Sequence, residues 1–396
     1  MVTMIPISDT ARQDIWRARN FQRLHSTIER VRKCGVVCTH KDGVSLSVAE
    51  DVSGKRKARF GNLHSCGSVW SCYRCSYVVA RARGDELAMM IRAYRALTGG
   101  DVVFVTLTAA HKASDRLVDL WDGVTEAYRH VVNSRRFKNM RGELSPDGEG
   151  GYTSDGLVDG YIKATEATHG DHGWHPHLHL LFFVPDAWEF GRNFSAIRKL
   201  WIDGLAKQGM QASKEGQRFR TVSEERIDTL AHYVGKGAHA WGVEDEITGG
   251  MRKNGKHGRT PMEILHGLVH NEAEPGDLKL WHEWEQVSHG KRQLVHSRFG
   301  GIWSILGSEI RPDQEIAEQT GDELDQQEPR PDERVLGYIP SEIWSALLRH
   351  RRTAVLEMLE ILELIDSSAE DEALEDFEYR LGVPIFSREE LLANSS

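Results

Sequence analysis

The sequence contains little cysteine, and most of what it has is clustered. Only 5 of the 396 residues are cysteine, and three of them fall within ten positions. A small secreted protein held together by disulfides is much richer in cysteine, so this class is excluded. No apolar run approaches the ~20 residues that a membrane-spanning helix needs, and the first residues lack the charged-then-apolar layout of a secretory signal. We therefore expect a soluble, cytoplasmic protein with no membrane partner.

Acidic and basic residues are unevenly distributed along the chain. Hydrophobic residues make up 40% of the sequence and charged residues 28%, which indicates a globular chain long enough for two or three domains. Residues 311–396 contain 8 basic and 22 acidic side chains, whereas the first 310 residues contain 42 basic and 37 acidic ones. A mildly basic body with an acidic appendage is compatible with a nucleic-acid-binding protein, although an acidic tail can also be only solvated surface.

Three histidines alternate in one apolar segment, GWHPHLHLLFFVP, residues 173–185. Side chains of a β-strand alternate between its two faces, so His175, His177 and His179 should project from the same face. Two imidazoles at neighbouring positions on one face can hold a divalent cation. The alternative interpretation is a row of surface histidines on a half-exposed strand. Glu166, on the preceding strand, is our choice for a further ligand. This donor set suits Mg²⁺ or Mn²⁺, with His177 and His179 as ligands and His175 as an additional candidate expected outside the ligand set.

A second cluster of metal-ligating residues lies upstream of the histidines. Cys66, Cys72 and Cys75 have the close spacing of a zinc knuckle. A CxxC pair can also be a redox pair, but a third nearby thiol argues against that interpretation. The candidates for a fourth ligand are Cys34, Cys38 and His64. A structural Zn²⁺ would contribute an apparent binding free energy of ~10–16 kcal/mol to a small, loop-rich element.

Several motifs together resemble the HUH endonuclease superfamily. His177-Leu178-His179 is similar to its His-hydrophobic-His motif, and the longer GWHPHLHLL resembles the form found in rolling-circle plasmid replication initiators of Gram-positive and actinobacterial type. FVTLT (104–108) resembles the first family motif and HYVGK (232–236) the third, while CGSVWSCYRC and RTPMEIL look like flanking family segments. The resemblance covers roughly residues 30–305 with the motifs in the family's order. It also favours Cys34, in RKCG, as the fourth zinc ligand.

The resemblance implies a tyrosine nucleophile. Tyr233 occupies the family's Tyr-x-x-Lys motif, and Lys236 lies three positions later on the same helical face. A phenol with a pKa near ~10 needs help to ionise, which a nearby ammonium and a metal-polarised phosphate supply. Some relatives carry a glutamate four residues before the tyrosine, where this chain has Thr229. A basic loop offers four candidates for DNA-backbone contacts, or for mere solvation: Arg252, Lys253, Lys256 and Arg259.

The predicted fold is α+β, with an antiparallel sheet that has strands near 102–108, 160–167 and 177–184 and is backed by helices. The resemblance implies that this sheet is the RRM-like palm of an HUH endonuclease. Four segments are expected. They are an N-terminal helix and zinc-knuckle region at 1–100, the HUH nickase catalytic domain at 101–307, an acidic linker at 308–334, and a small acidic helical C-terminal module at 335–396.

The resemblance implies a rolling-circle replication initiator that nicks one strand of a plasmid origin. Tyr233 would form a 5′-phosphotyrosyl link and free a 3′-hydroxyl, an exchange that needs no ATP, and the sequence has no P-loop pattern. The expected partners are single-stranded or hairpin origin DNA, a host helicase and a DNA polymerase. Two alternatives remain: a transposase of the same superfamily, which usually carries two catalytic tyrosines on one helix, and a non-catalytic zinc-containing DNA-binding regulator. A relaxase fits less well, because there the tyrosine precedes the histidines.

Overall fold

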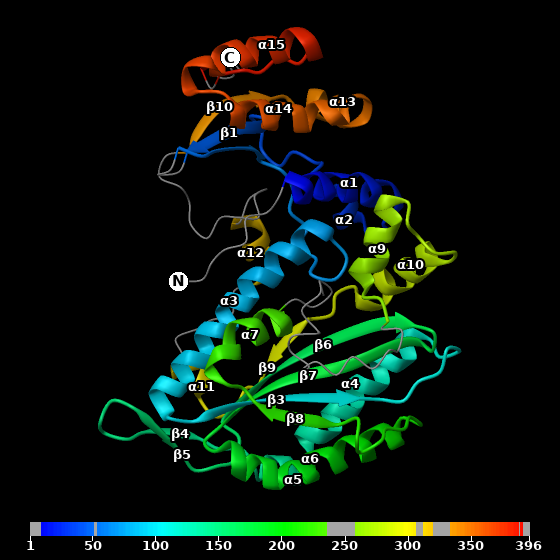
Figure 1. The fold of residues 1–396 in the computed structure, drawn as a ribbon, viewed down its shortest axis with the longest axis vertical. Coiled ribbons are helices and arrows are strands. Elements are labelled where there is room, and N and C mark those ends of the chain that lie inside the picture. Colours follow the sequence, from blue (N-terminus) through cyan, green and yellow to red (C-terminus); the bar gives the residue numbers. More distant parts are fainter. Residues whose placement is uncertain are drawn as a thin grey trace. The chain divides into compact units, whose positions relative to one another are not determined.

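The chain forms two compact units (Figure 1). A computed structural model describes residues 9–50, 54–235, 258–305, 312–319, 333–387 and 389–390. Unit 1 consists of residues 1–68, 72–78 and 313–396, and unit 2 consists of residues 69–71 and 79–312. The long helix α3 (Tyr73–Thr98) begins in unit 1 and continues in unit 2.

Unit 2 is built on a five-stranded antiparallel sheet with the order β8-β3-β7-β6-β9. The strands are β3 (Asp101–Thr108), β6 (Gly160–Gly170), β7 (Gly173–Val184), β8 (Arg218–Thr221) and β9 (Leu294–His296). The three strands expected from the sequence are the three central ones, rich in the β-branched and aromatic residues that pack well on a pleated surface. The prediction of an α+β fold with an antiparallel sheet is therefore confirmed.

Helices cover both faces of this sheet (Figure 1). Val105, Leu180 and Phe182 pack with helices α4 (Leu117–Asn133), α5 (Arg135–Lys138) and α6 (Ala187–Lys207). The residues of opposite parity, such as Phe104 and Leu181, pack with the C-terminal part of α3 and with α7 (Ile227–Gly235). Because strand side chains alternate, each face has its own core.

A tight hairpin sets the register between β6 and β7. Gly170 pairs with Gly173 across the two-residue turn Asp171-His172. Gly173 has a φ of +82°, a backbone conformation that favours glycine, and a Cβ there would lie 3.0 Å from the Cα of Ala113. In the resulting register Glu166 lies directly opposite His177.

The rest of unit 2 consists of short elements around the sheet. Thr260 and Glu263 form a capping box with Pro261 in the first turn, which fixes the start of helix α9. The remaining elements within the described part of unit 2 are a 3₁₀ turn (Glu224–Arg226), α9 (Pro261–His270), α10 (Asp277–Ser288), α11 (Ile302–Ile305) and the hairpin β4 (Leu144–Pro146) and β5 (Tyr152–Ser154).

Unit 1 joins the two ends of the sequence in one core. Its antiparallel sheet has the order β10-β1-β2, so a strand near the C-terminus pairs with one near the N-terminus. Trp16, Phe60 and Trp344 are in mutual aromatic contact. The elements are α1 (Asp9–His25), α2 (Glu29–Lys33), β1 (Val44–Glu50), β2 (Arg56–Gly61), α12 (Asp313–Gln319), β10 (Arg334–Ile339), α13 (Ser341–His350), α14 (Arg352–Leu364), a 3₁₀ turn (Ser367–Ala369) and α15 (Glu370–Leu381).

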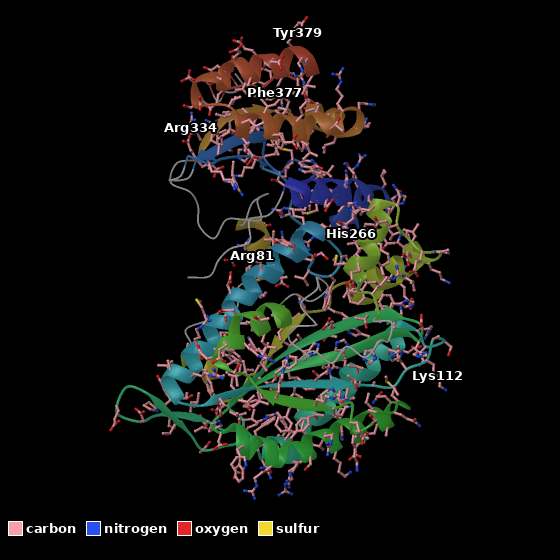
Figure 2. All side chains as sticks on the ribbon, in the orientation of Figure 1. Arg81, Lys112, His266, Arg334, Phe377 and Tyr379 are labelled. Carbon is pink, nitrogen blue, oxygen red and sulfur yellow. The ribbon has the colours of Figure 1, made fainter. Side chains whose placement is uncertain are left out.

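This grouping differs from the sequence-based division, which set residues 335–396 apart from residues 1–100. Phe377 of α15 is buried in the shared core while Tyr379 is exposed (Figure 2). Arg56 of β2 forms a buried ion pair with Glu370 of α15. A segment of about 60 residues buries too little apolar surface to be strongly stable alone, so the acidic helices complete a core with the N-terminal strands. Within the predicted linker, α12 is helical.

No helix within the described ranges combines the length and the apolar character that a membrane crossing requires.

Candidate functional site

The histidine strand and its neighbour bring three of the predicted ligands together. Glu166 on β6 faces His177 on β7, and His179 lies two residues further along the same face. One ligand atom from each residue lies within 4.8 Å of the other two. His177, His179 and Glu166 are only 8%, 5% and 7% exposed, so their charges and lone pairs must be satisfied within the protein. The expected same-face geometry is present, and this Glu-His-His cluster could hold a metal ion.

Both histidines approach the same carboxylate oxygen of Glu166. Glu166 Oε2 lies 2.9 Å from Nε2 of His179 and 3.3 Å from Nε2 of His177. Burial alone would raise the pKa of Glu166, but the hydrogen bonds and charges of the two histidines outweigh burial and hold the pKa below its usual range. The carboxylate is therefore ionised at neutral pH and is available to a cation.

The opposite ring nitrogens each contact a separate oxygen atom. His177 Nδ1 lies 3.1 Å from the carbonyl oxygen of His175, and His179 Nδ1 lies 3.2 Å from Oγ1 of Thr106 on β3. With an ion bound, an Nδ1–H donated to such an oxygen would leave the Nε2 lone pair for the metal, whereas without an ion Nε2–H donates to Glu166. Burial lowers the pKa of His179, which keeps its imidazole neutral. Thr106 belongs to the FVTLT motif, but its contact with His179 was not foreseen from the sequence.

His175 lies beside the cluster rather than within it. Its ring stacks on that of His177 with centroids 5.2 Å apart, and it also contacts His111 at 4.7 Å. Burial and the neighbouring histidines lower the pKa of His175 to about 3, so the ring is neutral. His175 is absent from the group formed by Glu166, His177 and His179, and its role as a supporting residue stays a prediction.

Helix α7, which carries Tyr233, packs on the sheet face that carries the histidines. Its residues Ile227, Leu230, Ala231 and Val234 share a core with Phe104, Ala164 and Leu181. Phe104 lies opposite Leu181, and Ala164 lies opposite His179. Because positions 179 and 181 of β7 point to the same side, both residues lie on the histidine face. Tyr233 is in the last turn of α7. Its side chain and the whole of Lys236 lie outside the described residues.

The four cysteines Cys34, Cys66, Cys72 and Cys75 form one buried cluster in unit 1. Their sulfur atoms lie 3.5 Å apart for Cys34–Cys75, 3.6 Å for Cys34–Cys72 and 3.7 Å for Cys66–Cys75. Tetrahedral zinc with Zn–S bonds of ≈ 2.3 Å requires sulfurs about 3.8 Å apart, so the spacing fits. All four are free thiols, which leaves them available as ligands.

The other two candidates for the fourth position lie elsewhere. Cys38 donates to the carbonyl oxygen of His40, 3.2 Å away, and His64 is absent from the cluster. Cys34 directly follows α2, and Cys75 is in the first turn of α3. Hydrogen bonds from the other three cysteines, together with the charge of Arg74, lower the pKa of Cys75 well below its usual value. This favours a thiolate, the form that binds metal.

The basic-loop candidates divide into those described and those not. Arg252, Lys253 and Lys256 lie outside the described residues. The Arg259 guanidinium donates two hydrogen bonds to Asp277, at 2.8 and 2.7 Å, and its backbone pairs with His169. Arg259 thus has an intramolecular role that ties the loop to α10, and its contact with DNA stays a prediction.

Comparisons with known proteins point to two relatives. The chain is 26% identical over 288 residues to "Protein rep" of Streptomyces lividans, a match that covers 60% of this chain and 63% of that protein. It is 31% identical over 137 residues to the "Neomycin resistance protein" of Streptomyces cyanogenus, covering 31% of each chain. The chain therefore spans less than two thirds of the length of either relative. No family model and no solved structure matches it.

Proposed function

We propose that this chain is a rolling-circle replication initiator of the HUH type, which nicks one strand at a plasmid origin and captures the 5′ end. The observation that carries the proposal is the Glu-His-His cluster on the same sheet face as the helix that bears Tyr233. The similarity to "Protein rep" supports the role in replication. The antiparallel five-stranded sheet is, in this proposal, the RRM-like HUH palm.

The proposed reaction is a transesterification. The Oη atom of Tyr233 attacks the scissile phosphorus, the P–O3′ bond breaks, and a 5′-phosphotyrosyl link forms. The tyrosine loses its proton and the departing 3′ oxygen gains one, so no ATP is consumed. Glu166, His177 and His179 would hold a Mg²⁺ or Mn²⁺ ion, which when bound polarises the phosphate oxygens. Lys236 would neutralise the developing phenolate or position the phosphate.

The cysteine cluster has a separate, structural role in this proposal. Four thiolates saturate a tetrahedral Zn²⁺ and leave no position for substrate. Origin DNA in single-stranded or hairpin form would be the nucleic-acid partner, with Arg252, Lys253, Lys256 and Arg259 as candidate backbone contacts. The freed 3′-hydroxyl is a primer, so a host polymerase and a helicase would follow in the cytoplasm.

The decisive experiment is mass spectrometry of a trapped protein–oligonucleotide adduct. Wild-type protein with Mn²⁺ should nick supercoiled origin plasmid and carry the oligonucleotide on Tyr233. Tyr233→Phe keeps the ring but lacks the attacking oxygen, so it should form no adduct while binding origin DNA with near-normal affinity.

The matched control is Tyr379→Phe, because Tyr379 is 90% exposed in unit 1. This variant should nick like the wild type. An adduct in Tyr233→Phe would assign the nucleophile to another tyrosine. A wild-type protein that binds origin DNA but never nicks it would instead support a non-catalytic regulator.

A further inference from the structure

Edge strand β8 places two arginines on the face that carries the Glu-His-His cluster. In the antiparallel register with β3, Arg220 lies opposite Phe104 and Arg218 opposite Thr106. Thr106 in turn lies opposite His179 on β7. Directly opposed residues share a face of the sheet, so both arginines are on the histidine face, two strands away from β7. Figure 1 shows β8 running beside β3.

An aromatic ring connects Arg220 to the cluster. The Cζ atom of Arg220 lies 5.0 Å from the ring centroid of Phe104. The same ring stacks on the imidazole of His179, with centroids 5.1 Å apart and planes inclined by 19°. A guanidinium over an aromatic face is attracted by the ring quadrupole, which restricts where the side chain can lie. Phe104 thus orients Arg220 and also contacts His179, one of the proposed metal ligands.

Contacts of Gln217 and Phe219 fix the orientation of strand β8. The buried Gln217 accepts a hydrogen bond from the amide of Thr108 at 2.8 Å and donates to the carbonyl of Ser213 at 3.0 Å. Phe219 points to the opposite face, where it contacts Phe194 with centroids 4.8 Å apart. These contacts set the phase of β8, so the arginines at 218 and 220 project to the histidine face.

We propose that Arg220, with Arg218 beside it, binds backbone phosphates of the DNA strand next to the scissile phosphate. The inference rests on the proposed function. An in-line transesterification needs the strand held beside the attacked phosphorus as well as at it. The guanidinium is the side chain best suited to that task, since its fork of donors matches phosphate oxygens. Arg220 and Arg218 are therefore positioning residues, and the Glu-His-His cluster serves the reacting phosphate.

The test uses full-length Arg220→Gln, Arg218→Gln and Arg220→Lys. The matched control is Arg192→Gln, since Arg192 is also an arginine over an aromatic ring, 4.8 Å from Trp188, but lies on α6 behind the other face. Binding is measured with oligothymidylate over a range of salt concentrations. Single-turnover cleavage is measured with an oligonucleotide that spans the nick mapped for the wild type.

Arg220→Gln should weaken DNA binding by about 10- to 100-fold, the usual range for a lost charge-assisted hydrogen bond. Its salt slope should fall by about 0.7, the value for one phosphate contact on a single strand. Arg218→Gln should lower both quantities by less, because the Arg218 guanidinium already donates to the carbonyl oxygen of Glu215, 3.2 Å away. Arg220→Lys should recover part of the affinity, and Arg192→Gln should match the wild type.

Neutralising a single phosphate distinguishes a direct contact by Arg220 from an indirect effect of the substitution on the structure. A methylphosphonate at the contacted position should weaken wild-type binding about as much as Arg220→Gln does, and should have no further effect on that variant. If Arg220→Gln keeps the wild-type salt slope, or if every methylphosphonate weakens it as strongly as the wild type, the inference is wrong.

Two readouts keep this inference distinct from the proposed function. Mn²⁺ binding by Arg220→Gln should be unchanged, which reports that β3 and β7 are intact; if it is lost, Arg220→Lys and Arg218→Gln decide the question through their salt slopes. If the wild type never nicks, the proposed function fails, yet the oligothymidylate slopes still decide whether Arg220 contacts phosphate.

Discussion

The two candidate metal sites differ in the number and the chemical kind of their donors. In unit 1, four sulfurs from Cys34, Cys66, Cys72 and Cys75 lie within 4.8 Å of one another, and four is the number of ligands that a structural zinc takes. In unit 2, Glu166, His177 and His179 offer one oxygen and two nitrogens. A cation that prefers six ligands would keep open positions there for phosphate and water. The number of protein donors thus distinguishes a site that can only stabilise a fold from one that can also bind a substrate.

The supports of the two sites differ as well. The cysteines come from the end of a short helix, a loop and the start of α3, and a bound ion would cross-link these pieces in addition to hydrogen bonds such as that from Arg74 to Ser65. The three unit 2 ligands come from two adjacent strands whose register is set by a hairpin. The first site should therefore depend on its ion for folding, whereas the second should be preformed.

The largest expected effect is on the cysteine site. Cys72→Ser removes one of four ligands from the buried cluster and should abolish stoichiometric zinc, measured by elemental analysis. Because a structural zinc contributes ~10–16 kcal/mol of apparent binding free energy, thermal unfolding of unit 1 should shift sharply downward. Cys38→Ser is the matched control and should change neither quantity, since Cys38 lies outside the cluster. A zinc-free wild type with normal stability would refute the structural role.

A large but different effect is expected at the second site. His177→Ala or His179→Ala should reduce Mn²⁺-dependent nicking by at least about a thousandfold, since a bound cation supplies several kcal/mol of transition-state stabilisation. Zinc content and the unfolding temperature should stay near the wild-type values. His289→Ala, an exposed histidine at the end of α10, is the control. Wild-type nicking by either variant would show that the cation binds elsewhere.

A smaller effect is expected from the hydroxyl that orients His179. Thr106→Val keeps the β-branched shape but removes the hydroxyl that lies 3.2 Å from His179 Nδ1. Outer contacts of this kind typically contribute 10–100-fold in metal affinity, so Mn²⁺ titration should reveal a loss in that range. Thr108→Val lies two residues along the same strand, and its hydroxyl contacts Gly216 rather than a histidine. Equal losses in both variants would mean that Thr106 acts only through packing.

The smallest expected effect is on the pH dependence of stability. It concerns Lys163, a buried residue on the face of the sheet opposite the Glu-His-His cluster. Lys163 is 9% exposed, and burial lowers its pKa to about 8. The unfolded chain, with an ordinary pKa near 10.4, then binds more protons than the folded one between those values. Stability should therefore rise with pH from about 8 to 10.4, by at most about 1.4 kcal/mol per pH unit.

Lys163→Met removes this titration, so the difference in unfolding free energy between variant and wild type should shrink as pH rises through that window. Urea denaturation at several pH values measures it. A difference that does not vary with pH would mean that Lys163 keeps its charge when folded.

Local patterns in the sequence predict much of the fold and most members of both clusters of metal-ligating residues. The alternation of His175, His177 and His179 in an apolar run predicts a strand with one histidine face, because side-chain direction in a strand follows from the backbone alone. The close spacing of Cys66, Cys72 and Cys75 likewise predicts neighbouring thiols. The three central strands follow from their β-branched and aromatic residues. None of these inferences requires knowing where distant segments lie.

The tertiary structure decided the contacts between residues far apart in the chain. Only the packing of unit 1 brings Cys34, rather than Cys38 or His64, to the three other thiols. The pairing of β10 with β1 likewise removed the boundary that the acidic composition suggested, because composition reports solvation and not strand partners.

In unit 2 the same reason applies to Arg220 and Thr106. Both residues are more than 40 positions from the three ligands in the chain, and the pairing of β3 with β7 and of β8 with β3 places them on the face that carries the cluster. Alternation and spacing are properties of a few consecutive residues, and the sequence determined them by itself. Register between distant strands depends on the whole core, and therefore only the folded chain decided which side chains meet.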